Sequence, residues 1–156
     1  MSYLIILLVI AMAVAPVLAL KPTKKQRLLV RLRDRARLHA LQVQLGELPQ
    51  THRQKVRLED PEPGAAYRIL WRHEEAKTRQ FQYVLHRDEV ERISVPETIV
   101  MALREALDNL PENIVAVEFS NLGVAVYWRE TGDEAEVDLI ANQLSLLKDH
   151  LATLSL

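Results

Sequence analysis

The side chains best suited to acid–base or metal chemistry lie between two predicted strands. His73, Glu74 and Glu75 are consecutive, and His86 would join them if strands over residues 67–72 and 80–86 form a hairpin. Imidazole and carboxylate groups can transfer protons or bind a divalent metal. A polar connection between strands also collects such residues without any function. We therefore assign no catalytic, cofactor-binding or metal-binding residue.

Other catalytic signatures are missing from the sequence. It has no cysteine, no Gly-x-Ser-x-Gly motif and only four glycines, which are scattered. These facts exclude a thiolate site, a nucleophile elbow and a glycine-rich phosphate loop. The larger aromatic residues could form a binding patch, but packing in the core is the more frequent fate; they are Tyr67, Trp71, Tyr83, Tyr127 and Trp128. We expect a protein that is not an enzyme.

Charge is distributed very unevenly along the chain. Residues 21–37 have one acid, Asp34, and eight basic residues, which are Lys21, Lys24, Lys25, Arg27, Arg31, Arg33, Arg35 and Arg37. Residues 39–156 have 12 basic and 20 acidic residues, a net charge of −8. An acidic body repels phosphate backbones, so we expect no nucleic acid as partner.

We call residues 21–37 the basic collar. An apolar segment precedes it. Residues 3–20 carry no charge over eighteen positions. A helix of that length spans about 27 Å, close to the hydrocarbon thickness of a bilayer. Pro16 removes one backbone donor, which membrane helices tolerate. The sequence predicts a transmembrane anchor over residues 1–20.

The basic collar also predicts the orientation of this anchor. Basic residues that flank a span favour the cytoplasmic side, which places the N-terminus outside and the following domain in the cytoplasm. A cleaved signal ending at Ala19 is the alternative, but such a signal has its positive charge before the apolar run. We expect an uncleaved single-pass protein of a bacterial inner membrane.

The collar itself has the pattern of a helix. Within residues 21–40, apolar residues recur at helical spacing, as Leu28, Leu29, Leu32, Ala36 and Ala40. Such a basic amphipathic helix can lie along anionic lipid headgroups. Alternatively, its apolar stripe packs on the domain while its basic residues act only as topology determinants.

Residues 41–156 are predicted to form one cytoplasmic α+β domain. Alternating apolar residues and turn signals give the order strand, strand, strand, helix, strand, strand, helix. The predicted strands cover 41–45, 67–72, 80–86, 114–119 and 124–128, with a helical turn near 51–56 and helices over 96–110 and from 133 to the chain end.

This order indicates a two-layer sandwich with its helices on one face of the sheet. From residue 80 onward it reads β-α-β-β-α, which resembles the ferredoxin-like arrangement without its last strand.

The last predicted helix has an apolar residue at every third or fourth position. These residues are Val137, Ile140, Leu144, Leu147, Leu151 and Leu154. We expect them to cover the sheet, and a coiled-coil seam that pairs two copies of the chain is the alternative.

Together, these features predict a membrane-anchored adaptor, scaffold or accessory subunit whose cytoplasmic domain binds another protein. The loop over residues 52–62 and the apolar seam of the last helix are the surfaces to test first. One alternative is a membrane-tethered enzyme or small-ligand sensor with a site near His73, Glu74 and Glu75. Another is an envelope assembly protein whose domain faces the periplasm.

Overall fold

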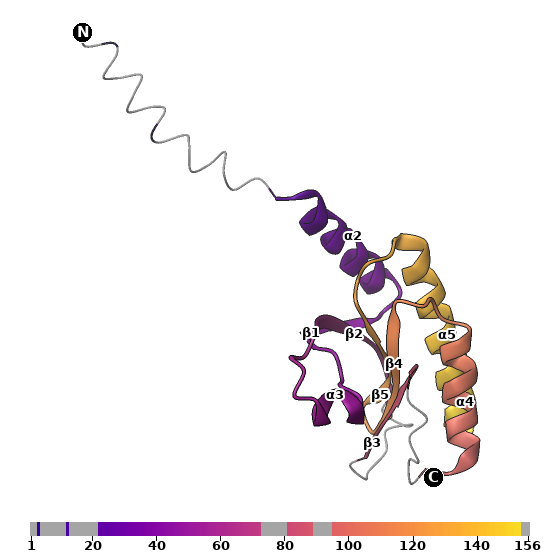
Figure 1. Ribbon diagram of the computed structural model, residues 1–156. Helices are drawn as coiled ribbons and strands as arrows, with labels where there is room; N and C mark the ends of the chain where they lie inside the picture. Colours follow the sequence, from indigo (N-terminus) through magenta and orange to yellow (C-terminus); the bar gives the residue numbers. More distant parts are fainter. Residues whose placement is uncertain (1–2, 4–11, 13–21, 73–80, 89–94, 154–156) are drawn as a thin grey trace. The chain divides into compact units, whose positions relative to one another are not determined.

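A computed structural model describes residues 3, 12, 22–72, 81–88 and 95–153 of the chain. These residues form an α+β fold with a five-stranded antiparallel sheet and four helices (Figure 1). The elements are α2 (Lys24–Leu38), β1 (Gln42–Glu47), α3 (His52–Val56), β2 (Pro63–Leu70), β3 (Gln82–His86), α4 (Glu97–Asp108), β4 (Ile114–Ser120), β5 (Gly123–Trp128) and α5 (Glu134–Thr153).

The chain divides into two compact units, Met1–Val30 and Arg31–Leu156, and the boundary falls within α2. The first unit contains the beginning of α2. The second contains the last turns of α2, the whole sheet and the other three helices.

The sheet has the order β1-β2-β5-β4-β3, and every neighbouring pair is antiparallel. The hairpin of β4 and β5 lies inside the sheet, as the β-branched and aromatic residues of these segments predict. Its turn requires Gly123, because a Cβ atom there would collide with the carbonyl of Ile69 on β2. The centre of the sheet is therefore built from the segments with the strongest strand pattern.

Helices α4 and α5 lie side by side on one face of the sheet (Figure 1). In α5, the residues at three- and four-residue intervals are fully covered, with Val137, Ile140 and Leu151 at 0% exposure. The prediction that this stripe covers the sheet is confirmed for the five of its six residues that are described. Leu154 lies outside them.

The ends of the helices follow from local hydrogen bonds. Pro96 precedes α4, where its missing amide proton costs nothing. The Asp133 carboxylate accepts a hydrogen bond from the amide of Glu136 at 3.1 Å and caps α5 as predicted. Thr51 and Gln54 form a capping box at the short helix α3.

The predicted hairpin between the second and third strands is wrong. β2 pairs with β1 on one side and with β5 on the other, so neither edge of β2 is available to β3. β3 instead pairs with β4, which places Leu85 opposite Val117.

The ferredoxin-like comparison is also wrong in its strand pairing. The order β-α-β-β-α from residue 82 onward is confirmed. In a split β-α-β unit, the strands on either side of the helix are parallel and separated by another strand. Here β3 and β4, which flank α4, are direct antiparallel neighbours.

Among the described residues, no helix is both long and apolar enough to cross a membrane. The predicted anchor over residues 1–20 lies outside this description except at Tyr3 and Met12.

Candidate functional site

The basic residues of the collar have two different environments. Lys24, Lys25 and Arg27, at the start of α2, are exposed. Arg31, Arg33 and Arg35 form ion pairs with acids of the loop after β5 and of α5, and Arg37 pairs with Asp34 in its own helix. Lys21 lies outside the described residues. The predicted membrane-surface role of these residues stays a prediction.

Glu130 is the buried centre of these contacts. Its two carboxylate oxygens accept hydrogen bonds from Arg33 Nε at 2.9 Å and Nη2 at 2.6 Å, and Tyr67 Oη donates a third at 2.9 Å. Burial raises the pKa of Tyr67 and the neighbouring carboxylate adds to it, so the phenol stays protonated. The backbone of Glu130 has a φ of 53°, which is uncommon for a residue with a side chain. Since Glu130 is only 7% exposed, loss of Arg33 would leave a buried charge without its cation.

A second, more exposed set surrounds Asp138 on α5. Arg35 donates two hydrogen bonds to this carboxylate, at 2.6 and 2.8 Å, and His39 Nε2 lies 2.7 Å from Oδ1. The Arg35 guanidinium and then His39 lower the pKa of Asp138 to about 2. We call Arg31, Arg33, Arg35, Glu130, Glu134 and Asp138 the α2 ion-pair cluster. It joins the last turns of α2 to the domain, where Leu32 and Ala36 are also buried.

The hairpin on which the alternative enzyme or sensor site was predicted does not form. His73, Glu74 and Glu75 lie outside the described residues, and β2 and β3 are not neighbours. His86 lies on β3 opposite Ala116, in a hollow of about 180 Å³ with Thr51, Arg53, Gln54, Asp88, Val115 and Arg129. Within the described part of the chain, no three metal-binding side chains gather.

A buried carboxylate, that of Glu118, lies on the face of the sheet opposite α4 and α5. Glu118 on β4, which is 1% exposed, accepts hydrogen bonds from Arg68 Nη2 at 2.8 Å, Gln82 Nε2 at 2.9 Å and Tyr127 Oη. Burial opposes ionisation, but the three donors outweigh it and lower the pKa of Glu118. Burial and the same carboxylate raise the pKa of Tyr127. A base with a lowered pKa and an acid with a raised one transfer protons poorly near neutral pH, so this group favours a structural role.

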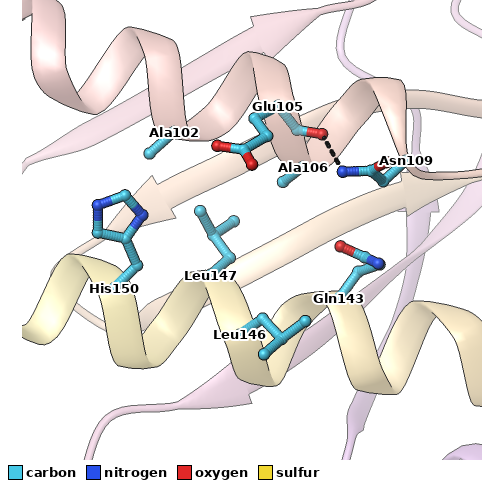
Figure 2. Close-up of a pocket in the computed structure, with 8 residues that line it drawn as sticks. All are labelled: Ala102, Glu105, Ala106, Asn109, Gln143, Leu146, Leu147 and His150. Atoms are coloured by element: carbon cyan, nitrogen blue, oxygen red, sulfur yellow. Dashed lines mark hydrogen bonds between the residues drawn. The ribbon is translucent and has the colours of Figure 1, made fainter.

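The helical layer carries a different kind of feature on its outer side. Figure 2 shows a hollow between α4 and α5, with Glu105 and Asn109 on one side and Gln143 and His150 on the other. Ala102, Ala106 and Leu147 are buried at its base, and Leu146, which is 57% exposed, is at its rim. Asn109 Nδ2 donates a hydrogen bond to the carbonyl of Glu105 at 2.9 Å.

The size of this hollow indicates what it can accept. Its volume is about 230 Å³, whereas sites for small molecules have about 300–1,000 Å³. A space of this size fits one or two side chains better than a whole cofactor. A shallower hollow next to it is lined by Met101, Arg104 and Asp108, and shares Glu105 and Asn109 with the first.

We call the outer side of α4 and α5 around these two hollows the helical surface. Its exposed apolar residues are Met101, Leu139 and Leu146, at 65, 39 and 57% exposure. Sequence reasoning missed it because the hollow forms between two helices whose packing the sequence does not give. One signal in the sequence could have indicated this surface. Leu146 is apolar but lies outside the stripe that includes Leu147, so it has no place in the core.

Most of the larger aromatic residues pack in the core, which was the favoured expectation over a binding patch. Tyr67, Trp71 and Trp128 are buried at 0, 8 and 0% exposure, and the rings of Tyr67 and Trp128 pack edge to face at 5.2 Å. Only Tyr83 and Tyr127 are partly exposed.

Comparisons with protein-family models, with curated proteins and with solved structures find no match to this chain.

Proposed function

We propose that this is a non-catalytic adaptor or accessory subunit that is anchored in the membrane and binds a helix of a partner protein on the helical surface. The observation that carries the proposal is the hollow between α4 and α5, which has an apolar base of Ala102, Ala106 and Leu147 and the exposed side chain of Leu146 at its rim. Exposed apolar side chains that gather around a concavity are typical of protein-binding surfaces. The first hollow is small, and the second, at about 480 Å³, is shallow and open, so the surface favours an inserted side chain over an enclosed metabolite.

The acidic charge of the domain favours an amphipathic helix with basic residues as the occupant. Glu105 and Asp108 outnumber Arg104 among the charged residues of the second hollow, and residues 39–156 carry a net charge of −8. A partner helix would insert one apolar side chain above Ala102 and Ala106 and direct Lys or Arg toward Glu105. This combination of an apolar anchor and complementary charge is a common mode of helix recognition.

The proposed location is a bacterial inner membrane, with a single span over residues 1–20, the N-terminus outside and the domain in the cytoplasm. The uncharged residues 3–20 and the basic residues that follow support it. A reporter that is active only in the periplasm, fused after Leu156, should be inactive. Activity of that reporter would favour the alternative of an envelope assembly protein.

Site-specific photo-crosslinking tests the partner surface. A photoreactive amino acid replaces Leu146 on the helical surface or, as the matched control, Leu122, a 55% exposed apolar residue in the turn between β4 and β5. We expect an adduct in native membranes from position 146 only, and its peptide should map to a basic amphipathic helix. Leu146→Lys should abolish the adduct formed through a second photoreactive residue at Met101, while the unfolding free energy changes by less than about 0.5 kcal/mol.

Three results would contradict this assignment. The first is the same set of adducts from both positions, which would indicate non-specific contact. The second is an adduct between two copies of this chain, which would favour self-association through α5. The third is persistence of the adduct in the Leu146→Lys variant.

A further inference from the structure

The two halves of α2 use their basic side chains differently. Arg31, Arg33 and Arg35 are paired with Glu134, Glu130 and Asp138 of the domain. Lys24, Lys25 and Arg27 are exposed and belong to the first unit, whose described residues include no acid. We call these three residues the N-terminal basic cluster.

The N-terminal basic cluster is at the unfavourable end of its helix. α2 starts with a capping box, in which Gln26 N donates to Thr23 Oγ1 at 3.2 Å and Thr23 N donates to Gln26 Oε1 at 2.8 Å. The following first turn contains no acidic residue, although the helix dipole favours acids there and disfavours Lys and Arg. Helix stability therefore does not explain these three cations.

We infer that six of the eight basic residues of the collar act as two sets of three. The N-terminal basic cluster binds the phosphates of anionic lipid headgroups, whereas Arg31, Arg33 and Arg35 hold the end of α2 against the domain and do not contact lipid. This inference rests on the proposed anchor, because residues 3–20 bring the cluster to the membrane surface. It assigns to lipid only the exposed cations at the beginning of α2.

Charge and position favour a lipid surface over a nucleic acid as the source of these phosphates. The cluster follows a predicted span directly, so headgroups are within reach at high local concentration. A long polyanion would also approach the rest of the chain, whose residues 39–156 carry a net charge of −8. Each basic residue at an anionic membrane surface strengthens binding about fivefold. The combined effect of three such residues on lipid binding is therefore large enough to measure.

Two triple variants with the same change in net charge test the inference. K24Q/K25Q/R27Q removes the N-terminal basic cluster, and R31Q/R33Q/R35Q removes the cations of the α2 ion-pair cluster. The full chain is reconstituted into nanodiscs of phosphatidylcholine, with or without phosphatidylglycerol. Amide hydrogen exchange is followed at residues 27–30, and thermal unfolding is followed for the domain.

The two variants should give opposite results. In the wild type, phosphatidylglycerol should slow exchange at residues 27–30 by about tenfold. K24Q/K25Q/R27Q should lose this slowing and keep the same Tm. R31Q/R33Q/R35Q should keep the slowing and lower the Tm by about 5 °C or more.

Several outcomes would overturn the division of the collar. One is an equal loss of the lipid effect in both variants, because net charge alone would then be responsible. A second is an undiminished lipid effect in K24Q/K25Q/R27Q. A third is the same slowing caused by duplex DNA in nanodiscs without phosphatidylglycerol, which would assign the cluster to nucleic acid. A wild-type chain that stays with neither kind of nanodisc would refute the anchor itself, which is a distinct failure.

Discussion

The two faces of the sheet are stabilised by different forces, and neighbouring residues of β4 show the contrast. Phe119 faces α4 and α5 and is 0% exposed, in contact with the rings of Trp71, Phe81 and Tyr83. Glu118 faces the other way and is 1% exposed, but its carboxylate is bound by Arg68, Gln82 and Tyr127. Equal burial is thus reached by removing apolar surface from water on one face and by pairing charge on the other.

This difference teaches how each face responds to change. Apolar packing is insensitive to pH and requires only that volume is preserved. A buried ion pair depends on both partners, since the loss of one leaves the other buried and charged. The polar contacts of Glu118 therefore require the observed alignment of four strands, since its donors lie on β2, β3 and β5.

The largest effect should come from Phe119→Ala. Loss of the phenyl ring leaves a cavity and removes three aromatic contacts, with ring centroids at 5.9, 4.9 and 6.1 Å. The unfolding free energy should fall by about 3–5 kcal/mol. Urea denaturation should give the same loss at pH 7 and pH 4. A clear pH dependence of this loss would show that the two faces are not independent.

Glu118→Ala should cost nearly as much, about 3–5 kcal/mol at pH 7, because it leaves the Arg68 guanidinium buried without its carboxylate. The matched control is the double variant R68M/E118L, which replaces both charges with apolar groups and should be closer to wild type than Glu118→Ala. Urea denaturation measures both variants. A double variant less stable than Glu118→Ala would indicate that the pair contributes net stability beyond mutual neutralisation.

A smaller effect is expected from pH in the unmodified chain. The folded-state pKa of Glu118 lies below its ordinary 4.5 and that of Asp138 is about 2 against an ordinary 3.8. The unfolded chain therefore binds more protons than the folded chain in acid. The contribution of both carboxylates to the unfolding free energy should be fully present above about pH 5 and should decrease as the pH falls toward 2. In Glu118→Ala this decrease should be shallower, and an unchanged slope would show that Glu118 does not contribute to it.

Much of the fold could be predicted from the sequence, because each element has a clear local signal. The β-branched runs of β4 and β5, the stripe on α5, the helix start at Pro96 and the cap at Asp133 all depend on residues a few positions apart. Strand pairing was harder to predict from the sequence. The choice of β4 rather than β2 as the neighbour of β3 depends on which edges β5 and β1 already occupy.

The candidate sites could be predicted only in part for the same reason. The eight basic residues were visible as a cluster, but the acids that bind Arg33 and Arg35 are 97 and 103 positions away. The hollow between α4 and α5 arises where Ala102 and Ala106 on one helix meet Leu147 on the other. Neither arrangement leaves a periodic pattern in the chain.

By itself, the sequence determined the element types, the stripe on α5 and the charge contrast between residues 21–37 and 39–156. These properties depend on composition and on local periodicity, which a linear chain already contains. Only the tertiary structure decided the strand order, the burial of Glu118 and Glu130, and the division of the collar at Arg31. Long-range contacts decide these features, since packing in space chooses among partners that look equivalent along the chain.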